Sequence, residues 1–276
     1  MNPSSFAEFA MDVARRGGAH LMSLLTQTAS AKQIRLKGPT DLVTRADHEV
    51  EALIAAAITR AFPAHGLLAE EGTTRAGADH RWIVDPLDGT TNFAHGLPWF
   101  GVSIALEHEG SVVLGVVYHP PLDELYVAER SGGSWVALRG GSFVRLQVSA
   151  TADLGSAVLA TGLAGREQRA YLRSMPTFLE QAREVRIMGS AALHLAMVAA
   201  GRIDAFWEPG LNLWDIAAGT LLVEEAGGRV TDLAGRPAPR GDILASNDRL
   251  HASMLALLGA PPPGTAVGGG MDTTAR

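Results

Sequence analysis

The sequence predicts a layered α/β protein whose first half is α+β, and two patterns along the chain support this. Five short apolar segments between residues 101 and 148 are separated by turn sequences such as Glu109-Gly110 and Pro120-Pro121, which is typical of a β-meander. Beyond residue 150, segments with strand and helix patterns alternate, which indicates an α/β arrangement. We therefore expect helices layered on sheets.

The change of pattern near residue 150 also predicts where the chain divides. We expect an N-terminal α+β domain over 1–150, a C-terminal α/β domain over 151–259 and a disordered tail over 260–276. The tail reads APPPGTAVGGGMDTTAR, which is rich in Pro and Gly and has almost no core-forming residues. A chain of 276 residues is long enough for two domains.

Composition excludes several classes of function. The net charge is −6, so the chain lacks the basic surface of a nucleic-acid-binding protein. The absence of cysteine excludes disulfides, thiolate zinc sites and a cysteine nucleophile. Glu8 and Asp12 interrupt the first apolar stretch, unlike a secretion signal. No run of about 18 apolar residues predicts a membrane span, so we expect a soluble, cytoplasmic protein.

Two helices precede the strands in the first half. Apolar residues at helical spacing predict a helix over 5–27, which Gly17-Gly18 weakens in its middle. A second helix is expected to start at Thr44, because Thr44 and Asp47 have the spacing of a capping box. Short buried strands follow, with a polar loop between them; the strands are 67–69 and 82–84, and the loop is 73–81.

The remaining elements follow from the same patterns. Meander strands are expected at 101–107, 112–118, 124–129, 134–138 and 143–148. In the second half, strands are expected at 157–160, 184–187, 203–207, 229–231 and 243–245, and helices at 166–182, 190–200, 214–226 and 247–258. Gly227-Gly228 is a typical helix-stop signal.

Five acidic residues stand at the ends of predicted elements: Asp47, Glu70, Asp85, Asp88 and Asp215. Glu70 and Asp85 each end an apolar strand, and in layered α/β folds ligands usually bind at strand ends. Each acid also has a simpler explanation as a helix cap, a solvated turn or a turn former. For Asp47 the spacing alone favours the cap. The simpler explanations are weaker for the whole set, because these acids interrupt apolar runs.

If the acids converge, their chemistry points to a divalent cation and a phosphate. Oxygen-only ligation selects Mg²⁺ or Mn²⁺, and Mg²⁺ is often shared between carboxylates and a substrate phosphate. The turn Gly89-Thr90-Thr91 follows Asp88 and offers N–H groups and hydroxyls to an anion. Two such metal ions can activate a water for attack. The histidines show no H-E-x-x-H spacing, and neither a Walker A nor a G-x-G-x-x-G sequence is present.

Four segments together resemble one known family. Residues 82–93, WIVDPLDGTTNF, resemble the central motif of the inositol monophosphatase family, whose members are Mg²⁺-dependent, lithium-sensitive sugar phosphatases. LAEEG at 68–72 resembles the family's Glu-Glu motif, DLVTRAD at 41–47 resembles its D-L-V-T-x-x-D segment, and LWDIAAG at 213–219 resembles its W-D-x-A-A-G helix start. Order and spacing agree over residues 5–258, which is nearly the whole chain.

The resemblance implies a fold, a cofactor and a ligand set. The fold would be the αβαβα sandwich of the inositol monophosphatase and fructose-1,6-bisphosphatase type, with the site between the two domains. The cofactor would be Mg²⁺, with Mn²⁺ as a substitute and Li⁺ as an inhibitor. The metal ligands would be Glu70, Asp85, Asp88, Asp215 and the carbonyl of Leu87, most of them in the N-terminal domain. Catalysis would use Glu70, Thr90 and Asp47, with Thr90 hydrogen-bonded to Asp47 and positioning the attacking water.

Substrate-binding residues follow from the same resemblance. The phosphate would lie on the N–H groups of Gly89 and Thr90, beside the metal-site residues Glu70, Leu87, Asp88 and Asp215. A polyol pocket in the C-terminal domain would be lined by Gly189, Ser190, Ala191 and Glu208. Lys37 would be an accessory residue for a further metal or the phosphate, although it stands one residue nearer Asp41 than in some relatives. Gly72 stands where a Ser or Thr is often found.

The predicted activity is Mg²⁺-dependent hydrolysis of a small phosphorylated polyol, with myo-inositol 1-phosphate as the leading substrate. Histidinol phosphate, fructose 1,6-bisphosphate and adenosine 3′,5′-bisphosphate are alternatives with the same chemistry. A non-catalytic scaffold is a further alternative, because bacterial relatives associate with transcription or ribosome machinery, but the intact set of acids argues against it. By resemblance we also expect a homodimer, with neither a nucleic acid nor a membrane as partner.

Overall fold

The computed structural model describes residues 1, 3–25, 35–36, 42–77, 79–138, 141–162, 175–237 and 241–259. Several expectations lie wholly or partly outside these ranges. They concern Lys37 with the loop 38–41, the end of the predicted helix 5–27, residue 78 of the predicted loop 73–81, the first part of the predicted helix 166–182, and the tail 260–276.

Two helices form the outer layer of the N-terminal half, α1 (Ser5–Leu25) and α3 (Arg45–Ala61), close to the predicted positions. The pair Gly17-Gly18 allows close packing. A Cβ at Gly17 would lie 3.1 Å from Val50 of α3, and one at Gly18 would overlap the ring of Tyr118. These glycines therefore let α1 approach α3 and the sheet, which outweighs their low helix propensity.

Eight strands form the first sheet, in the order β10-β9-β8-β7-β6-β5-β3-β4. They are β3 (Gly66–Ala69), β4 (Thr74–Arg75), β5 (His80–Asp88), β6 (Gly101–His108), β7 (Ser111–His119), β8 (Glu124–Glu129), β9 (Gly133–Ala137) and β10 (Phe143–Arg145). The meander from β6 to β9 is close to the prediction, whereas β10 ends at Arg145 instead of residue 148. The polar loop expected at 73–81 is wrong in part, because β4 lies within it and β5 already begins at His80. Main-chain pairing with β3 holds β4 despite its polar side chains.

Two helices and a second sheet complete the interior. Helices α6 (Ala191–Ala199) and α7 (Leu213–Glu225) lie between the sheets. The second sheet has the order β12-β11-β13-β15-β14. Its strands are β11 (Val158–Thr161), β12 (Glu184–Arg186), β13 (Ala205–Leu211), β14 (Arg229–Thr231) and β15 (Gly241–Ser246). The outer helices are α5 (Met175–Gln181) and α8 (His251–Gly259).

Smaller elements join these layers. Strands β1 (Arg35–Leu36) and β2 (Leu42–Val43) pair with each other, and α4 (Thr90–Ala94) follows β5. Two short 3₁₀ turns lie at Pro120–Leu122 and Leu154–Ser156. Helix α8 begins later than the predicted start at residue 247, because Asp248 has a φ of 64° and the Asn247 side chain accepts a hydrogen bond from the N–H of Leu250 at 3.1 Å. Residues 247–250 therefore form a turn.

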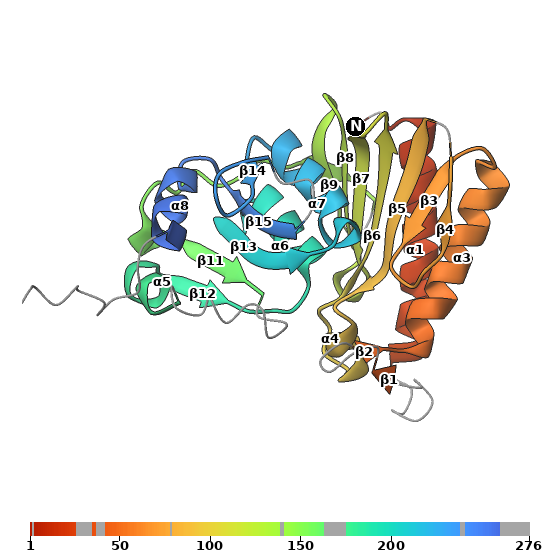
Figure 1. Cartoon of the computed structure of the whole chain (residues 1–276), viewed down its shortest axis with the longest axis horizontal. Coiled ribbons are helices and arrows are strands. Elements are labelled where there is room, and N and C mark those ends of the chain that lie inside the picture. Colours follow the sequence, from red (N-terminus) through yellow and green to blue (C-terminus); the bar gives the residue numbers. More distant parts are fainter. Residues whose placement is uncertain are drawn as a thin grey trace, which may run out of the picture.

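Successive residues of a strand pack into different hydrophobic cores on the two faces of the sheet, and this produces the layers seen in Figure 1. In β8, Leu125 faces the core beneath α1 and α3, whereas Tyr126 faces the core around α6 and α7. In β13, Phe206 faces the α6 and α7 core, whereas Trp207 faces the core beneath α5 and α8. The predicted αβαβα sandwich is confirmed. The domain division near residue 150 stays a prediction, since the middle core joins both halves.

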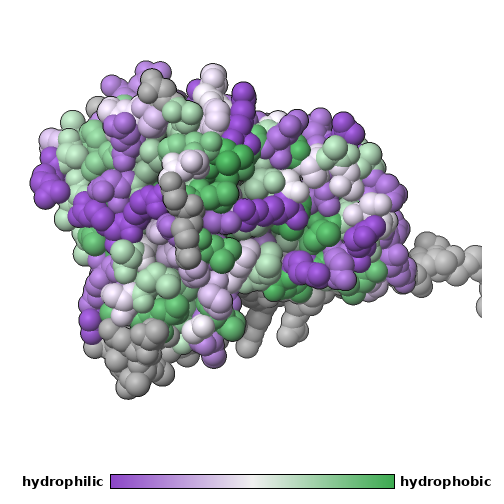
Figure 2. Space-filling view, turned by 180° about the vertical axis from the view of Figure 1, so that it is seen from behind, coloured by the Kyte–Doolittle hydropathy of each residue, from purple (hydrophilic) through white to green (hydrophobic). Residues whose placement is uncertain are grey.

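Hydrophilic and hydrophobic patches are interspersed on the face of the molecule shown in Figure 2. Among the described segments, no helix combines the length and apolar character needed to cross a bilayer.

Candidate active site

A bulge at the end of β5 presents two aspartates. Asp85 and Asp88 are three residues apart along β5, but their partners on β6, Ser103 and Gly101, are only two apart. The N–H of Leu87 turns back to donate to Asp85 Oδ1 at 2.9 Å. Bulges of this kind re-aim side chains. Both aspartates are therefore buried at the end of the strand instead of alternating between the two faces of the sheet.

Glu70 and Asp215 complete a group of four facing carboxylates. Glu70 follows β3, which is parallel to β5, and its N–H donates to Val84 O at 3.2 Å. Burial, followed by the charges of Glu70, Asp88 and Asp215, raises the pKa of Asp85 well above its usual value. Burial raises the pKa of Asp88 to about 6. Burial and the charges of Asp88 and Glu70 raise the pKa of Asp215 to about 7. The structure thus brings these four carboxylates together.

The donor set fits a divalent cation. Mg²⁺ and Mn²⁺ prefer carboxylate and carbonyl oxygens, and a cation would stabilise the ionised forms that burial and mutual repulsion disfavour. In the described ranges, no three acidic, His or Cys side chains are already arranged as a metal cluster. Several of these carboxylates instead have protein partners: a hydrogen bond joins Asp85 and Glu70, and Asp88 and Asp215 accept main-chain N–H groups. The ligand roles therefore stay a prediction.

Asp88 connects the first sheet to the start of α6. Its Oδ2 accepts the Ser190 hydroxyl at 2.5 Å and the N–H of Ala192 at 2.7 Å, while Oδ1 accepts the N–H of Ala191 at 3.3 Å. These bonds lower the pKa of Asp88, but burial outweighs them. Ser190 also caps α6 by accepting the N–H of Leu193. Ser190 and Ala191, predicted to line the polyol pocket, thus contact a predicted metal ligand directly.

Asp47 makes the cap that its spacing predicted and the contact with Thr90 that the family resemblance implied. Its Oδ2 accepts the N–H and the hydroxyl of Thr44 at 2.7 and 2.6 Å, which closes the capping box of α3. Its Oδ1 lies 3.0 Å from Thr90 Oγ1, which is also 3.0 Å from the carbonyl of Leu87. Asp47 is fully buried. The structure therefore connects Asp47 to Thr90, while the part that this pair plays in catalysis remains predicted.

The turn after Asp88 requires a glycine and is held by an asparagine. Gly89 caps α4 with a φ of 95°, and a Cβ there would lie 2.9 Å from Trp99 O. Asn92 Nδ2 donates to the carbonyls of Trp99 and Met188, each at 2.7 Å. Asn92 thereby ties the Gly89-Thr90 turn to the segment that leads into Gly189. It was missing from the predicted site, although its place inside WIVDPLDGTTNF was an available signal.

Two further predicted site residues, Asp215 and Glu208, lie in the C-terminal half. Asp215 stands in the first turn of α7, where its Oδ2 accepts the N–H of Asn212 at 2.6 Å. Glu208 is buried on β13, and a Cβ at Gly162 would overlap its carboxylate. Gly162 thus makes room for the Glu208 side chain. Lys37 lies outside the described residues.

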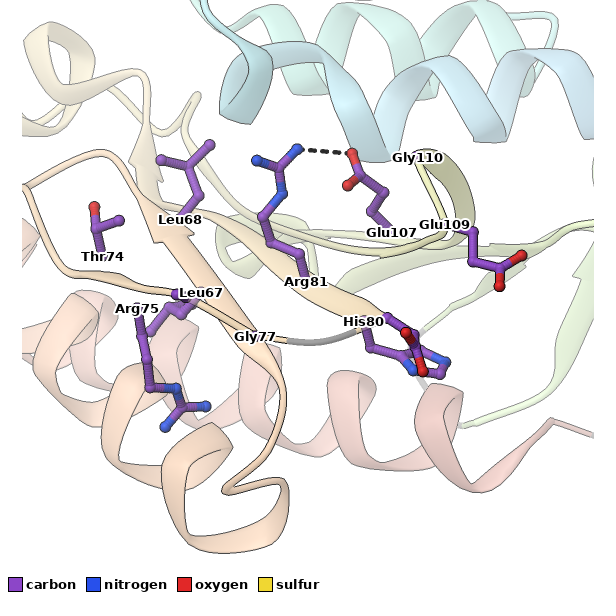
Figure 3. Close-up of a pocket in the computed structure, with 12 residues that line it drawn as sticks. Leu67, Leu68, Thr74, Arg75, Gly77, His80, Arg81, Glu107, Glu109 and Gly110 are labelled. Atoms are coloured by element: carbon purple, nitrogen blue, oxygen red, sulfur yellow. Dashed lines mark hydrogen bonds and ion pairs between the residues drawn. The ribbon is translucent and has the colours of Figure 1, made fainter.

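A separate hollow of about 550 Å³ lies at the opposite end of β5, around its first residues (Figure 3). His80, Arg81 and Glu107 are among its lining residues, and Arg81 and Glu107 form an ion pair at 2.8 Å. None of the predicted site residues lines it. The acidic cluster at the other end of β5 is therefore the candidate active site.

Known proteins match the chain over nearly its full length. The model of the inositol monophosphatase family matches residues 2–260. An inositol-1-monophosphatase of Mesorhizobium japonicum is 46% identical over 83% of this chain and 87% of its own length. Nus factor SuhB of Pseudomonas aeruginosa is 40% identical over 89% of this chain and 93% of its own. The crystal structure of extragenic suppressor protein SuhB from Bartonella henselae superposes with a TM-score of 0.88, at 40% identity, over 93% of this chain and 99% of that one.

Proposed function

Because the chain belongs to the inositol monophosphatase family, we propose that it hydrolyses myo-inositol 1-phosphate to inositol and phosphate with Mg²⁺ as its cofactor. Hydrolysis of a phosphoric monoester is the activity that the family and the related inositol-1-monophosphatases support. The observation that carries the proposal is the meeting of Glu70, Asp85, Asp88 and Asp215 in one cluster, of which Asp85 and Asp88 are buried. The negative charges of such a cluster favour the binding of cations, and the bound cations would attract a phosphate dianion.

The residues that would hold Mg²⁺ are the four carboxylates and the carbonyl of Leu87. The bound ions would neutralise phosphate charge and activate a water. Asp85 is the most buried of these carboxylates and the one on which the charges of the other three act, so it is the natural shared ligand. Mn²⁺ is expected to substitute because it prefers the same oxygen ligands, and Li⁺ is expected to inhibit.

The chain's own groups would handle the proton and the phosphate. Asp47 already accepts two bonds from Thr44 on Oδ2, so Oδ1 is left to orient the Thr90 hydroxyl. Thr90 would then hold the attacking water beside Glu70, and its oxygen would take a proton from that water as the Thr90 hydroxyl proton passes to Asp47 Oδ1. The N–H groups of Gly89 and Thr90, at the start of α4, would hold the phosphate. Phosphoryl transfer depends mainly on positioning and charge neutralisation, and the buried bonds of Asp47 provide the former.

The alcohol would be recognised on the C-terminal side. Ser190 and Ala191 donate hydrogen bonds to the proposed metal ligand Asp88, and the carbonyl of Gly189 accepts one from Asn92. Glu208 stands in a space made by Gly162. A carboxylate at Glu208 can accept hydrogen bonds from ring hydroxyls. We therefore assign polyol recognition to this side, and the relative named inositol-1-monophosphatase favours inositol 1-phosphate over histidinol phosphate, fructose 1,6-bisphosphate and adenosine 3′,5′-bisphosphate.

A substrate panel tests the proposal. Purified protein at fixed Mg²⁺ is given each of the four phosphate esters, and phosphate release is measured, with Asp85→Asn as the inactive control. We expect the highest kcat/KM with myo-inositol 1-phosphate, inhibition by Li⁺, and a raised KM without loss of metal binding in Glu208→Gln. Turnover of another ester alone would correct the substrate. Metal binding without any turnover would favour a partner-binding scaffold, which the similarity to Nus factor SuhB makes a specific alternative.

The oligomeric state and location belong to the same proposal. We propose a homodimer, and exposed apolar side chains near the site support a contact there: Leu97 is 53% and Ile187 is 52% exposed. Light scattering on the purified protein should give twice the mass of 29.0 kDa. A monomeric mass would contradict it. The proposed location is the cytoplasm, in keeping with a chain that uses no cysteine.

A further inference from the structure

Glu51 is a buried acid that the roles assigned so far leave unused. It lies on α3 and is only 4% exposed. Its Oε2 accepts the N–H of Glu71 at 2.6 Å, and its Oε1 accepts the N–H of Thr73 at 3.0 Å. Hydrogen bonds to an ionised carboxylate are roughly twice as strong as neutral ones. Both oxygens of Glu51 therefore hold the main chain of a single turn.

That turn carries Glu70. It begins at the end of β3 and closes on itself, since the N–H of Ala69 donates to Thr73 O at 3.0 Å. Gly72, at its apex, has a φ of 105°, which other residues adopt only under strain. One side of the turn is joined to β5 by the Glu70 N–H, and the other side is joined to α3 by Glu51. The direction of the Glu70 side chain is thus fixed from both sides.

The same helix holds two parts of the site at once. Asp47 and Glu51 are four residues apart on α3, so they lie one turn apart on the same face. Asp47 reaches Thr90, and Glu51 reaches the Glu70 turn. A shift of α3 relative to the sheet would therefore displace the Thr90 hydroxyl and the Glu70 carboxylate together.

We propose that Glu51 is a positioning residue for Glu70, and that it sets the affinity of the site for divalent cations by fixing the turn Ala69–Thr73. The inference rests on the proposed function in so far as Glu70 is a metal ligand. Residues that orient metal ligands change metal affinity or activity by about 10–100-fold when they are replaced. A purely structural role would lower stability without a selective effect on the metal.

Binding of Mn²⁺ alone, followed by the loss of its free-ion EPR signal, separates these roles. The variants are Glu51→Gln, Glu51→Ala and, as a matched control, Ile54→Ala, because Ile54 is fully buried on the same helix but belongs to the apolar core. We expect the Kd for Mn²⁺ to rise about 10–100-fold in Glu51→Ala and less in Glu51→Gln, which keeps one acceptor oxygen. Ile54→Ala should lower the Tm and leave the Kd unchanged.

Phosphatase assays across a Mg²⁺ series give a second readout. Glu51→Ala should need a higher Mg²⁺ concentration to reach its half-maximal rate. At saturating Mg²⁺, its kcat should return to near the wild-type value. Unchanged Mn²⁺ affinity in Glu51→Ala, or an equal loss in Ile54→Ala, would overturn the inference. If circular dichroism shows Glu51→Ala unfolded, Glu51→Gln decides by the same criteria. Wild-type protein that binds Mn²⁺ but hydrolyses no ester would overturn the proposed function alone, and wild-type protein that binds no Mn²⁺ would overturn both.

Discussion

The starts of α3 and α7 have the same local chemistry and different surroundings. In each helix an aspartate in the first turn accepts the main-chain N–H of the cap residue, at 2.7 Å for Asp47 with Thr44 and 2.6 Å for Asp215 with Asn212. The other oxygen of Asp47 meets the Thr90 hydroxyl. Asp215 instead faces the charges of Asp88 and Glu70.

Under the proposed function, one residue serves both as a helix cap and as a functional acid at each of these helix starts. A carboxylate among hydroxyl and N–H donors is suited to orient a proton, whereas a carboxylate among other carboxylates needs a cation. The capping box is present in both helices, so spacing cannot separate the two functions. The two functions are distinguished by the residues that face the second oxygen of each carboxylate.

The largest expected effect is the difference in lost activity between a substitution in the acidic cluster and one at the α3 cap. Asp85→Asn removes the carboxylate on which the other three act, and we expect kcat/KM to fall about a thousandfold or more, since metal-ion charge stabilisation contributes several kcal/mol. Asp47→Asn leaves the predicted metal ligands intact and should lower kcat/KM by about 10–100-fold. Phosphate release from myo-inositol 1-phosphate measures both. Equal, mild losses in the two variants would contradict the distinction.

The next effect compares the two helix starts directly. Asp215→Asn should weaken Mn²⁺ binding at least about 10-fold, because even residues that only support ligands have effects of this size. Asp47→Asn should leave the Kd for Mn²⁺ within a small factor of the wild type, because Asp47 bonds only to protein donors. Calorimetric titration with Mn²⁺ measures the two affinities. If Asp47→Asn weakened Mn²⁺ binding more than Asp215→Asn, the metal would bind at the start of α3 and the prediction would be wrong.

A third prediction tests burial without neighbouring charge. His194 on α6 is fully buried, and its ring lies 4.8 Å from that of Phe206. Within the part of the chain that the structure describes, neither ring nitrogen has a hydrogen-bond partner. Burial lowers its pKa to about 4 from 6.5. The unfolded chain therefore binds this proton at a higher pH than the folded chain. The stability that His194 contributes is complete above pH 6.5 and is lost as the pH falls toward 4.

We expect the advantage of wild type over His194→Leu in free energy of unfolding to shrink by roughly 1–3 kcal/mol between pH 7 and pH 4.5. Urea unfolding at several pH values measures it, and taking the difference between two proteins cancels the titration of other groups. Parallel pH curves for the two proteins would show that burial alone does not set such shifts here.

The smallest effect concerns the cap itself. Thr44→Ala removes the hydroxyl that bonds to Asp47 Oδ2 and the acceptor of the Ala46 N–H, and should lower the free energy of unfolding by about 1 kcal/mol. Thr44→Ser keeps both bonds and is the control. Thermal unfolding measures the change. If Thr44→Ala also loses activity while Thr44→Ser does not, the cap and the orientation of Thr90 are coupled through Asp47.

Much of the fold could be predicted because its signals are local. The meander strands from β6 to β9 follow apolar runs between clear turns, and α3 follows its capping box. The short strand β4 could not be predicted, because its stability comes from pairing with β3 and not from its own residues. Gly17-Gly18 was interpreted as a weakness of α1, since its packing partners Val50 and Tyr118 are distant in sequence.

The sequence predicted the acidic residues of the site better than the hydrogen bonds that hold them in place. The acids Glu70, Asp85, Asp88 and Asp215 stood out because they interrupt apolar runs, and the structure brings them together. The bonds from Ser190 to Asp88 and from Asn92 to Met188 were not foreseen. Each joins residues about a hundred positions apart, and no local pattern encodes such a pair.

The bond between Asp88 and Ser190 has a consequence for the order of events during synthesis. Its partners are 102 positions apart, whereas each of the strand pairs from β6 to β9 joins neighbouring segments of the chain. Contacts of long sequence separation are slow to form, and domains generally fold N-terminal first as the ribosome delivers the chain. We expect the first sheet to be in place while Asp85 and Asp88 still lack α6 and α7. The nascent chain would thus meet the repulsion among Glu70, Asp85 and Asp88 as the first sheet forms, and the charge of Asp215 would be added only when α7 packs against that sheet.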